Sequence, residues 1–110
     1  MATAYAQLGV ARGVDQGKRW LLKASEYYDI GRGSQNHVVL HDKTVSKRHA
    51  LVECVDGLWF IQDLGSKHGT FVNDEQISER RALFHKDVIR IGKTWLVFGN
   101  VDPAKLQAPS

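Results

Sequence analysis

Cysteine, proline and long apolar runs are all scarce in this chain. Its 110 residues include one cysteine, Cys54, and two prolines. A single cysteine excludes an intramolecular disulfide and a cysteine-based zinc site, and nothing argues for an oxidising compartment. The longest apolar stretches are a few residues, far below the ~20 needed to span a bilayer, and residues 1–5 lack the features of a signal peptide. We expect a cytoplasmic protein, or a nuclear one if its source is eukaryotic, without membrane contact.

The composition that remains is typical of one globular domain. Hydrophobic residues make up 43% of the chain and charged residues 25%, which excludes disorder over most of its length. A chain of this length supports one core, so we expect a single domain over residues 1–101 and a polar tail or linker over residues 102–110. The formal net charge of +3 indicates an anionic partner: nucleic acid, phosphorylated protein or acidic lipid.

Short strands explain the pattern of the chain better than helices do. Ten glycines recur along it, and no long stretch has apolar residues at helical spacing. The Asp56-Gly57 dipeptide predicts a two-residue hairpin turn, and Gly92-Lys93 a second hairpin. Such short strands with turns between them imply an antiparallel sandwich or barrel. Brief apolar or β-branched runs predict strands over residues 5–10, 19–22, 27–31, 38–40, 49–55, 58–64, 70–72, 88–91 and 94–98.

Three loops between the apolar runs carry polar residues that a core does not need. In residues 31–34, two glycines leave the Arg32 guanidinium accessible to an oxyanion, which it grips with parallel hydrogen bonds. The second loop, residues 45–50, places the Ser46 hydroxyl beside two cations. The third, residues 63–73, combines many turn formers with further donors, which suits an anion site or an extended peptide. Taken singly, each loop is also explained as a solvated turn.

In order and spacing, the three motifs together resemble the signature of the forkhead-associated (FHA) domain, a phosphothreonine-binding β-sandwich. The resemblance rests on Gly31-Arg32, on Ser46 with His49 three residues later, and on the run from Ser66 to Asn73. It covers residues 21–99, about three-quarters of the chain. It implies an all-β fold of about eleven short strands in two sheets, in which loops at one end bind the ligand without catalysis.

The resemblance also implies a role for each matching residue. The expected phosphopeptide-binding residues are Arg32, Ser46, Lys47, Lys67 and His68. The expected framework residues, which shape the loops, are Gly31, His49, Gly69 and Asn73. The partner implied is a phosphothreonine-containing protein or peptide, a substrate of a protein kinase. No catalytic residue, metal or cofactor is expected.

His68 is the clearest departure from the family pattern, which usually has asparagine at this place. The family asparagine clamps the peptide backbone beside the phosphothreonine. Neutral imidazole also donates on one nitrogen and accepts on the other, so phosphate binding remains expected while peptide geometry changes. Histidine titrates near neutrality, so binding would depend on pH. A second departure, Lys86, replaces a common turn glycine and is remote from the site.

Other functions remain open at this point. An enzyme is disfavoured: His37 and His41 are four residues apart but lie in strand and loop, and no paired carboxylates, nucleophile elbow or Walker-type loop occurs. A nucleic-acid-binding β domain would use the basic loops, although single-strand binders interleave exposed aromatic residues with their cations. An FHA-fold module that binds an unphosphorylated partner is a third alternative. Self-recognition through phosphorylated Thr3 is a fourth.

Overall fold

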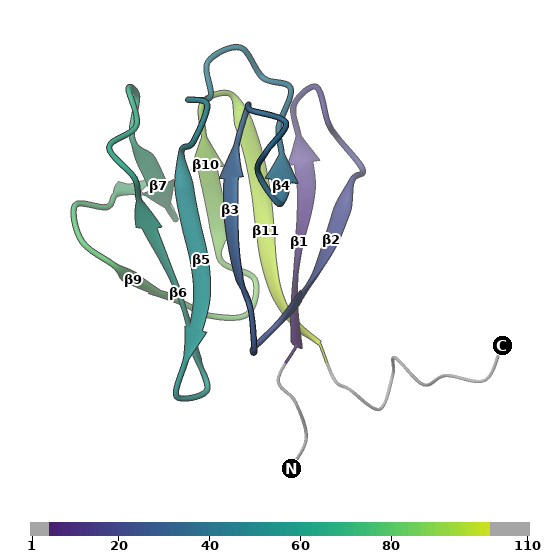
Figure 1. The fold of residues 1–110 in the computed structure, drawn as a ribbon, viewed down its shortest axis with the longest axis vertical. Helices are drawn as coiled ribbons and strands as arrows, with labels where there is room; N and C mark the ends of the chain where they lie inside the picture. The colour runs from purple at the N-terminus through teal and green to yellow at the C-terminus, as the bar shows by residue number, and fades with distance from the viewer. Residues whose placement is uncertain (1–4, 102–110) are drawn as a thin grey trace, which may run out of the picture.

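The chain folds into a β-sandwich (Figure 1). The computed structural model describes residues 5–101, so Thr3 and the expected tail at residues 102–110 lie outside the described residues. The two sheets have the strand orders β2-β1-β11-β10-β7-β8 and β4-β3-β5-β6-β9. The prediction of an all-β sandwich with about eleven strands is confirmed. The strands are β1 (Tyr5–Arg12), β2 (Arg19–Lys23), β3 (Tyr27–Gly31), β4 (Val38–Val39), β5 (Ala50–Val55), β6 (Leu58–Asp63), β7 (Thr70–Val72), β8 (Glu75–Gln76), β9 (Arg81–Leu83), β10 (Val88–Ile91) and β11 (Thr94–Val101).

The two sheets enclose one apolar core built from alternate residues of their strands. In β1, for example, Ala6, Leu8 and Val10 are buried while the residues between them are more exposed, as the period of two in a strand requires. Trp59 of β6 and Phe98 of β11 join the sheets, with ring centroids 6.1 Å apart. Burying an aromatic side chain of this kind contributes about 1.5–3 kcal/mol, so the core is a firm base for the loops that leave it.

The β5–β6 hairpin has the turn that its sequence predicts. Val55 pairs with Leu58, which leaves two residues in the loop. Asp56 and Gly57 have φ angles of 52° and 83°, both in the left-handed region that a type I′ turn requires. The hairpin prediction is therefore confirmed. This turn lies at the end of the sandwich opposite the polar loops (Figure 1).

Two edge strands, β8 and β9, were not predicted from the sequence. The structure places a turn at Asn73 and Asp74, with β8 directly after it. Both residues of β8 are polar and exposed, so no apolar alternation marks the strand. β9 has only three residues and forms the far edge of its sheet. Backbone pairing with a longer neighbour, rather than side-chain pattern, defines such edge strands.

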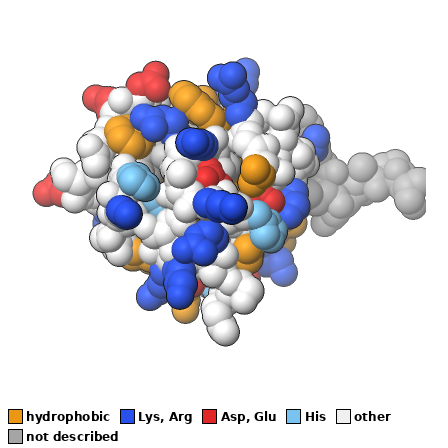
Figure 2. Space-filling view, turned by 90° about the horizontal axis from the view of Figure 1, so that it is seen from above, with side chains coloured by type: hydrophobic (Ala, Val, Ile, Leu, Met, Phe, Trp, Pro, Cys, Tyr) orange, Lys and Arg blue, Asp and Glu red, His pale blue; other side chains and the backbone are white. Residues whose placement is uncertain are grey.

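The polar loops gather at one end of the sandwich. The loops β1–β2, β3–β4, β4–β5, β6–β7 and β10–β11 lie together at the upper end of Figure 1, and Figure 2 looks onto that end. Cations and histidines crowd this face in Figure 2. Residues 5–101 include no helix long and apolar enough to cross a membrane.

Candidate functional site

A polar cavity of about 430 Å³ opens between the β3–β4, β4–β5 and β6–β7 loops. Four of its described lining residues are cations, and none is an aspartate or glutamate. All five residues expected to bind a phosphopeptide line it, so the structure brings together side chains up to 36 positions apart in the sequence, from 32 to 68. We call this cavity the phosphate pocket. Its lining is Arg32, Lys43, Thr44, Val45, Ser46, Lys47, Lys67 and His68.

Arg32 is anchored at its inner end and free at its outer end. Its backbone N–H donates to the carbonyl of Ser46 at 3.0 Å, and its Nε donates to the carbonyl of Val45 at 3.1 Å. Among residues 5–101, the two terminal guanidinium nitrogens have no hydrogen-bond partner. The side chain is thereby oriented, with its two forked donors left for an oxyanion.

Gly31 lets the β3–β4 and β4–β5 loops approach closely. A Cβ at this residue would lie 2.2 Å from the carbonyl oxygen of Lys47 and 2.8 Å from Asn36 Nδ2. The same two loops are joined by Asn36, whose Nδ2 donates to the carbonyls of Gly33 and Lys47 at 2.7 and 2.6 Å. Only a residue without a side chain fits here.

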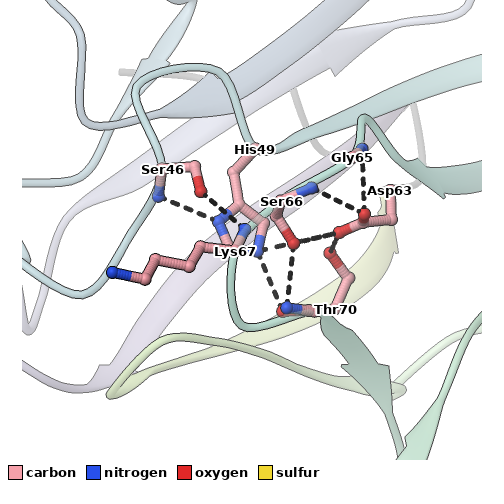
Figure 3. Close-up of polar contacts among 8 residues, drawn as sticks. Ser46, His49, Asp63, Gly65, Ser66, Lys67 and Thr70 are labelled. Atoms are coloured by element: carbon pink, nitrogen blue, oxygen red, sulfur yellow. Dashed lines mark hydrogen bonds and ion pairs between the residues drawn. The ribbon is translucent and has the colours of Figure 1, made fainter.

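Ser46 links the β4–β5 loop to the β6–β7 loop, as Figure 3 shows. Its Oγ accepts the backbone N–H of Lys67 at 3.0 Å, and its own N–H donates to His49 Nδ1 at 3.1 Å. A serine hydroxyl carries one donor besides its acceptor lone pairs. Because the Oγ accepts from Lys67, its proton remains available to a phosphate oxygen.

His49 is a buried structural histidine. Its side chain has no exposed surface, and its Nε2–H donates to the carbonyl of Gly69 at 2.9 Å while Nδ1 accepts from Ser46. These two bonds fix the neutral tautomer, and burial lowers the pKa of His49. Gly69 itself has a φ of 87°, in the left-handed region. His49 and Gly69 therefore hold the β4–β5 and β6–β7 loops together from beneath.

Asp63 organises the β6–β7 loop, a role that the sequence reasoning missed. Its carboxylate accepts the N–H groups of Gly65 and Ser66 at 3.0 and 2.9 Å and the hydroxyl of Thr70 at 2.7 Å (Figure 3). Burial raises the pKa of Asp63, but hydrogen bonds from Ser66 and Thr70 outweigh it and lower the pKa overall. The sequence did carry a local signal for this role. An aspartate that precedes two turn residues by two and three positions commonly accepts the backbone N–H groups of both.

Lys47, Lys67 and His68 complete the rim of the phosphate pocket. All three side chains are exposed, and none forms an ion pair or a side-chain hydrogen bond within residues 5–101. Their positions come from the backbone: the Lys47 carbonyl is held by Asn36, and the Lys67 N–H by Ser46. Hydrogen bonds thus hold the backbone of the rim, while its side-chain ends are exposed.

Asn73 lies apart from the phosphate pocket. Its φ is 49°, its Nδ2 donates to Asp87 Oδ1 at 3.0 Å, and its Oδ1 accepts the N–H of Val88 at 2.9 Å. These bonds tie the β7–β8 turn to the start of β10. Its direct contacts are with that strand rather than with the recognition loops.

The pocket provides oriented cations and hydrogen-bond donors. Among residues 5–101, no three histidine, cysteine, aspartate or glutamate side chains group as metal ligands. The buried His49 has both ring nitrogens engaged with backbone groups, which removes it as a base for Ser46. Such an arrangement is chemically suited to binding a multiply charged oxyanion.

Comparison with known proteins assigns this site to a family. The FHA domain family matches residues 28–92, which include every motif of the pocket. The chain belongs to the FHA family. A solved member of this family is described by its phosphothreonine-dependent interactions.

Two curated relatives and one solved structure illustrate the likeness. The chain is 39% identical over 93 residues to the glycogen accumulation regulator GarA of Mycolicibacterium smegmatis, covering 84% of this chain and 58% of GarA. It is 40% identical over 91 residues to the oxoglutarate dehydrogenase inhibitor of Corynebacterium diphtheriae, covering 83% of this chain and 62% of that protein. The chain thus spans about three-fifths of these relatives. A solved FHA domain with phosphothreonine-dependent interactions superposes with a TM-score of 0.79 at 28% identity, over 90% of this chain and 98% of that one.

Proposed function

We propose that the FHA module binds phosphothreonine through Arg32, Ser46, Lys47 and Lys67, with the phosphate in the pocket that these residues line. The observation that carries the proposal is the outward-facing guanidinium of Arg32 beside the braced Ser46 hydroxyl. Together they offer a planar pair of donors and a single donor to one oxyanion. Lys47 and Lys67 supply charge from the two sides of the pocket.

The charge and hydrogen-bond count of a phosphothreonine match this pocket. The group carries about −1.5 to −2 charges and three acceptor oxygens at neutral pH. Each hydrogen bond to a charged group contributes about 1.5–3 kcal/mol, so two or three of them dominate a small interface. We expect micromolar affinity, about −8 kcal/mol, for a single phosphopeptide.

His68 is proposed to contact the peptide backbone next to the phosphothreonine. Its side chain is exposed at the rim and has no hydrogen-bond partner among residues 5–101, so both ring nitrogens are available to a ligand. The framework residues Gly31, His49 and Gly69 act through loop position alone. For Asn73 we propose an indirect role, through the β7–β8 turn.

The test is binding of matched peptides by fluorescence anisotropy. Wild-type protein is expected to bind a phosphothreonine peptide and not its unphosphorylated form, and Arg32→Ala is expected to abolish the difference. Arg19→Ala, which removes an exposed arginine from the edge strand β2, serves as the matched control. Equal affinity for both peptides would overturn the proposal. Tight, steeply salt-dependent binding of an oligonucleotide that no phosphopeptide displaces would support the nucleic-acid alternative instead.

The partner is proposed to be a protein phosphorylated by an intracellular threonine kinase. GarA and the oxoglutarate dehydrogenase inhibitor are by name a regulator and an inhibitor, and the kinase and target for this chain are open to test.

Self-recognition through Thr3 would have to occur between two copies. Tyr5 begins β1 at the end opposite the pocket, and the strand's eight residues span about 27 Å, whereas two residues reach ~7 Å. Kinase treatment that raises the oligomer size of wild type but not of Thr3→Ala would identify it.

A further inference from the structure

β2 (Arg19–Lys23) is the longest of the four edge strands in the described sandwich. It has five residues, whereas the edge strands β4, β8 and β9 have two, two and three. Figure 1 shows β2 at the right-hand margin of the fold, and within the described residues it pairs with β1 on one side only. The row of backbone groups along an unpaired edge is a template for another strand.

Alternate residues of β2 turn their backbone groups away from β1. The Lys23 N–H donates to the Tyr28 hydroxyl at 2.9 Å and so does not take part in the pairing with β1. Residues along an antiparallel strand face the paired neighbour and the opposite side by turns, so Arg19 and Leu21 also direct their N–H and carbonyl groups to the open side. Within residues 5–101, none of these four groups has a hydrogen-bond partner. The edge therefore holds two donors and two acceptors for a further strand.

On the outer face of the sheet, β2 presents an apolar side chain between two cations. Leu21 is 45% exposed, and Arg19 and Lys23 are exposed on either side of it. Within residues 5–101, neither cation forms an ion pair. Their cross-strand neighbours on β1 are Gly9 and Tyr5, neither of which carries a negative charge. The edge is therefore positive, with an apolar centre.

The carboxylates nearest to β2 along the chain are both engaged elsewhere. Asp15 is 4% exposed and pairs with Lys18 at 3.1 Å. Glu26, in the β2–β3 turn, accepts the Tyr28 hydroxyl at 3.1 Å. The two cations of β2 are left for a carboxylate from another molecule.

The charges on β2 disfavour pairing between two copies of this chain. In a symmetric antiparallel pair of β2 strands centred on Leu21, Arg19 of each copy would lie opposite Lys23 of the other. Like charges directly opposite each other destabilise a strand pair. The formal net charge of +3 adds repulsion between copies. A strand that carries carboxylates at the same two positions would be attracted where a second copy is repelled.

We propose that the open edge of β2 binds an extended acidic segment of a partner protein, which pairs as a further strand of the six-stranded sheet. Side chains on one face are two residues apart, so the segment places carboxylates at its first and fifth residues, opposite the two cations. Its third residue is apolar and lies opposite Leu21. Backbone hydrogen bonds provide the affinity and the side chains the specificity, as in other strand additions.

The inner side of the same edge favours apolar residues between the carboxylates. Trp20 and Leu22 face the core side of β2, and Trp20 is only partly buried there. The second and fourth residues of the added strand would lie beside these two side chains and remove apolar surface from water. The best-fitting segment is therefore Glu-Val-Val-Val-Glu. Its pattern is the same in both directions, so it fits a parallel or an antiparallel strand.

This inference does not rest on the proposed function, because no residue of β2 lines the phosphate pocket. The experiment titrates the isotope-labelled full chain with the peptide Ser-Glu-Val-Val-Val-Glu-Ser, blocked at both ends, and follows the backbone amides by NMR. A second peptide has lysine in place of glutamate. A third has an N-methyl group on the central valine, which removes the donor opposite Leu21 and leaves the charges unchanged.

The expected result is binding of the glutamate peptide at β2. Hydrogen exchange of the Arg19 and Leu21 amides slows about five-fold at about 80% occupancy, since only the free fraction exchanges. The lysine peptide binds at least about ten-fold more weakly, because two attractions become two repulsions. The N-methylated peptide does not bind.

Variants of the chain separate charge from backbone pairing. The double variant Arg19→Glu, Lys23→Glu is expected to prefer the lysine peptide. The control double variant Arg80→Glu, Lys86→Glu changes the net charge equally at exposed sites outside β2 and is expected to keep the glutamate preference. Leu21→Pro removes an outward N–H, which an edge strand tolerates, and abolishes binding, whereas Leu21→Thr keeps it within about three-fold.

Three results would overturn the inference. The first is the absence of any exchange protection at β2 with the glutamate peptide. The second is equal binding of the N-methylated or the lysine peptide to wild type, which would exclude strand pairing or charge selection even if Leu21→Pro did not fold. The third is loss of glutamate-peptide binding in Arg32→Ala, which would place its carboxylates in the phosphate pocket. If the glutamate peptide binds β2 while a phosphothreonine peptide does not bind, only the proposed function fails.

Discussion

Replacing Gly31 by alanine is the sharpest test of how the loops are held. The new Cβ would lie 2.2 Å from the Lys47 carbonyl oxygen, whereas carbon–oxygen contacts normally begin near ~3.3 Å. Because the clashing oxygen belongs to the backbone, a side-chain rotation cannot relieve the contact, and the β4–β5 loop has to move by about 1 Å. Overpacking of this kind costs about 1–3 kcal/mol, against which the gain from a stiffer unfolded chain is about 0.4–1 kcal/mol. We expect a net loss of about 1–2 kcal/mol.

Thermal denaturation and peptide binding measure the two consequences of Gly31→Ala. A loss of about 1–2 kcal/mol lowers the melting temperature by roughly 4–16 °C in a domain of this size. Displacement of the Lys47 carbonyl also disturbs the Asn36 contact and the backbone bond from Gly33, so phosphopeptide affinity measured well below the melting temperature should fall at least about ten-fold.

Two other glycines provide graded controls for Gly31→Ala. At Gly9 the nearest atom to a new Cβ is Arg19 Cγ, at an ordinary 3.8 Å, so Gly9→Ala should be neutral or slightly stabilising. At Gly33 the Lys47 carbonyl oxygen lies 3.2 Å away, so an intermediate loss is expected. If Gly31→Ala melts within about 2 °C of wild type and binds peptide normally, the close approach of these loops does not hold the site together.

Three further outcomes follow from single side chains. Arg32→Lys should weaken phosphopeptide binding about ten-fold in anisotropy titrations with little change in melting temperature, since one ammonium cannot both bond Val45 and fork a phosphate; unchanged affinity would contradict this. Burial lowers the pKa of His49, so stability measured by urea denaturation should be full above about pH 6.5 and fall by up to ~1.4 kcal/mol per unit below it, a slope that His49→Gln should flatten. Lys86 has a φ of 74°, so Lys86→Gly should raise stability by about 1 kcal/mol in thermal melts, and a lower melting temperature would refute that strain.

Features with local sequence signals were predictable. The Asp56-Gly57 turn is one, because two successive left-handed residues have few sequence solutions. The buried alternation of β1 is another. Arg32, Ser46 and Lys67 were named from the resemblance of their motifs to the FHA signature, and all three line one pocket in the structure. Lys86 was recognised as standing where glycine is usual, and its left-handed φ is the physical reason for that preference.

Features that depend on distant partners were not predictable. The Asp42 carboxylate accepts hydrogen bonds from Lys93 and Thr94, about fifty positions away. No pattern in residues 41–44 indicates that contact. Asn36 joins two loops by donating to backbone carbonyls. Every residue has such a carbonyl, so no sequence pattern identifies the acceptors. β8 exists because the Asn73-Asp74 turn returns the chain against β7, not because its own residues favour a strand.

The separation between framework and ligand-facing groups bears on the alternative of an unphosphorylated partner. His49, Gly69 and Asp63 have their polar atoms engaged within the fold, whereas the outer ends of Arg32 and Lys67 keep free donors. His68 forms no hydrogen bond in the described residues, so its presence in place of asparagine leaves the framework unchanged. A module that had lost phosphate recognition would have no use for an anchored guanidinium beside a braced serine hydroxyl in a pocket without carboxylates. We therefore propose that the substitution at residue 68 changes how the peptide is oriented, and that phosphate is the group that the pocket binds.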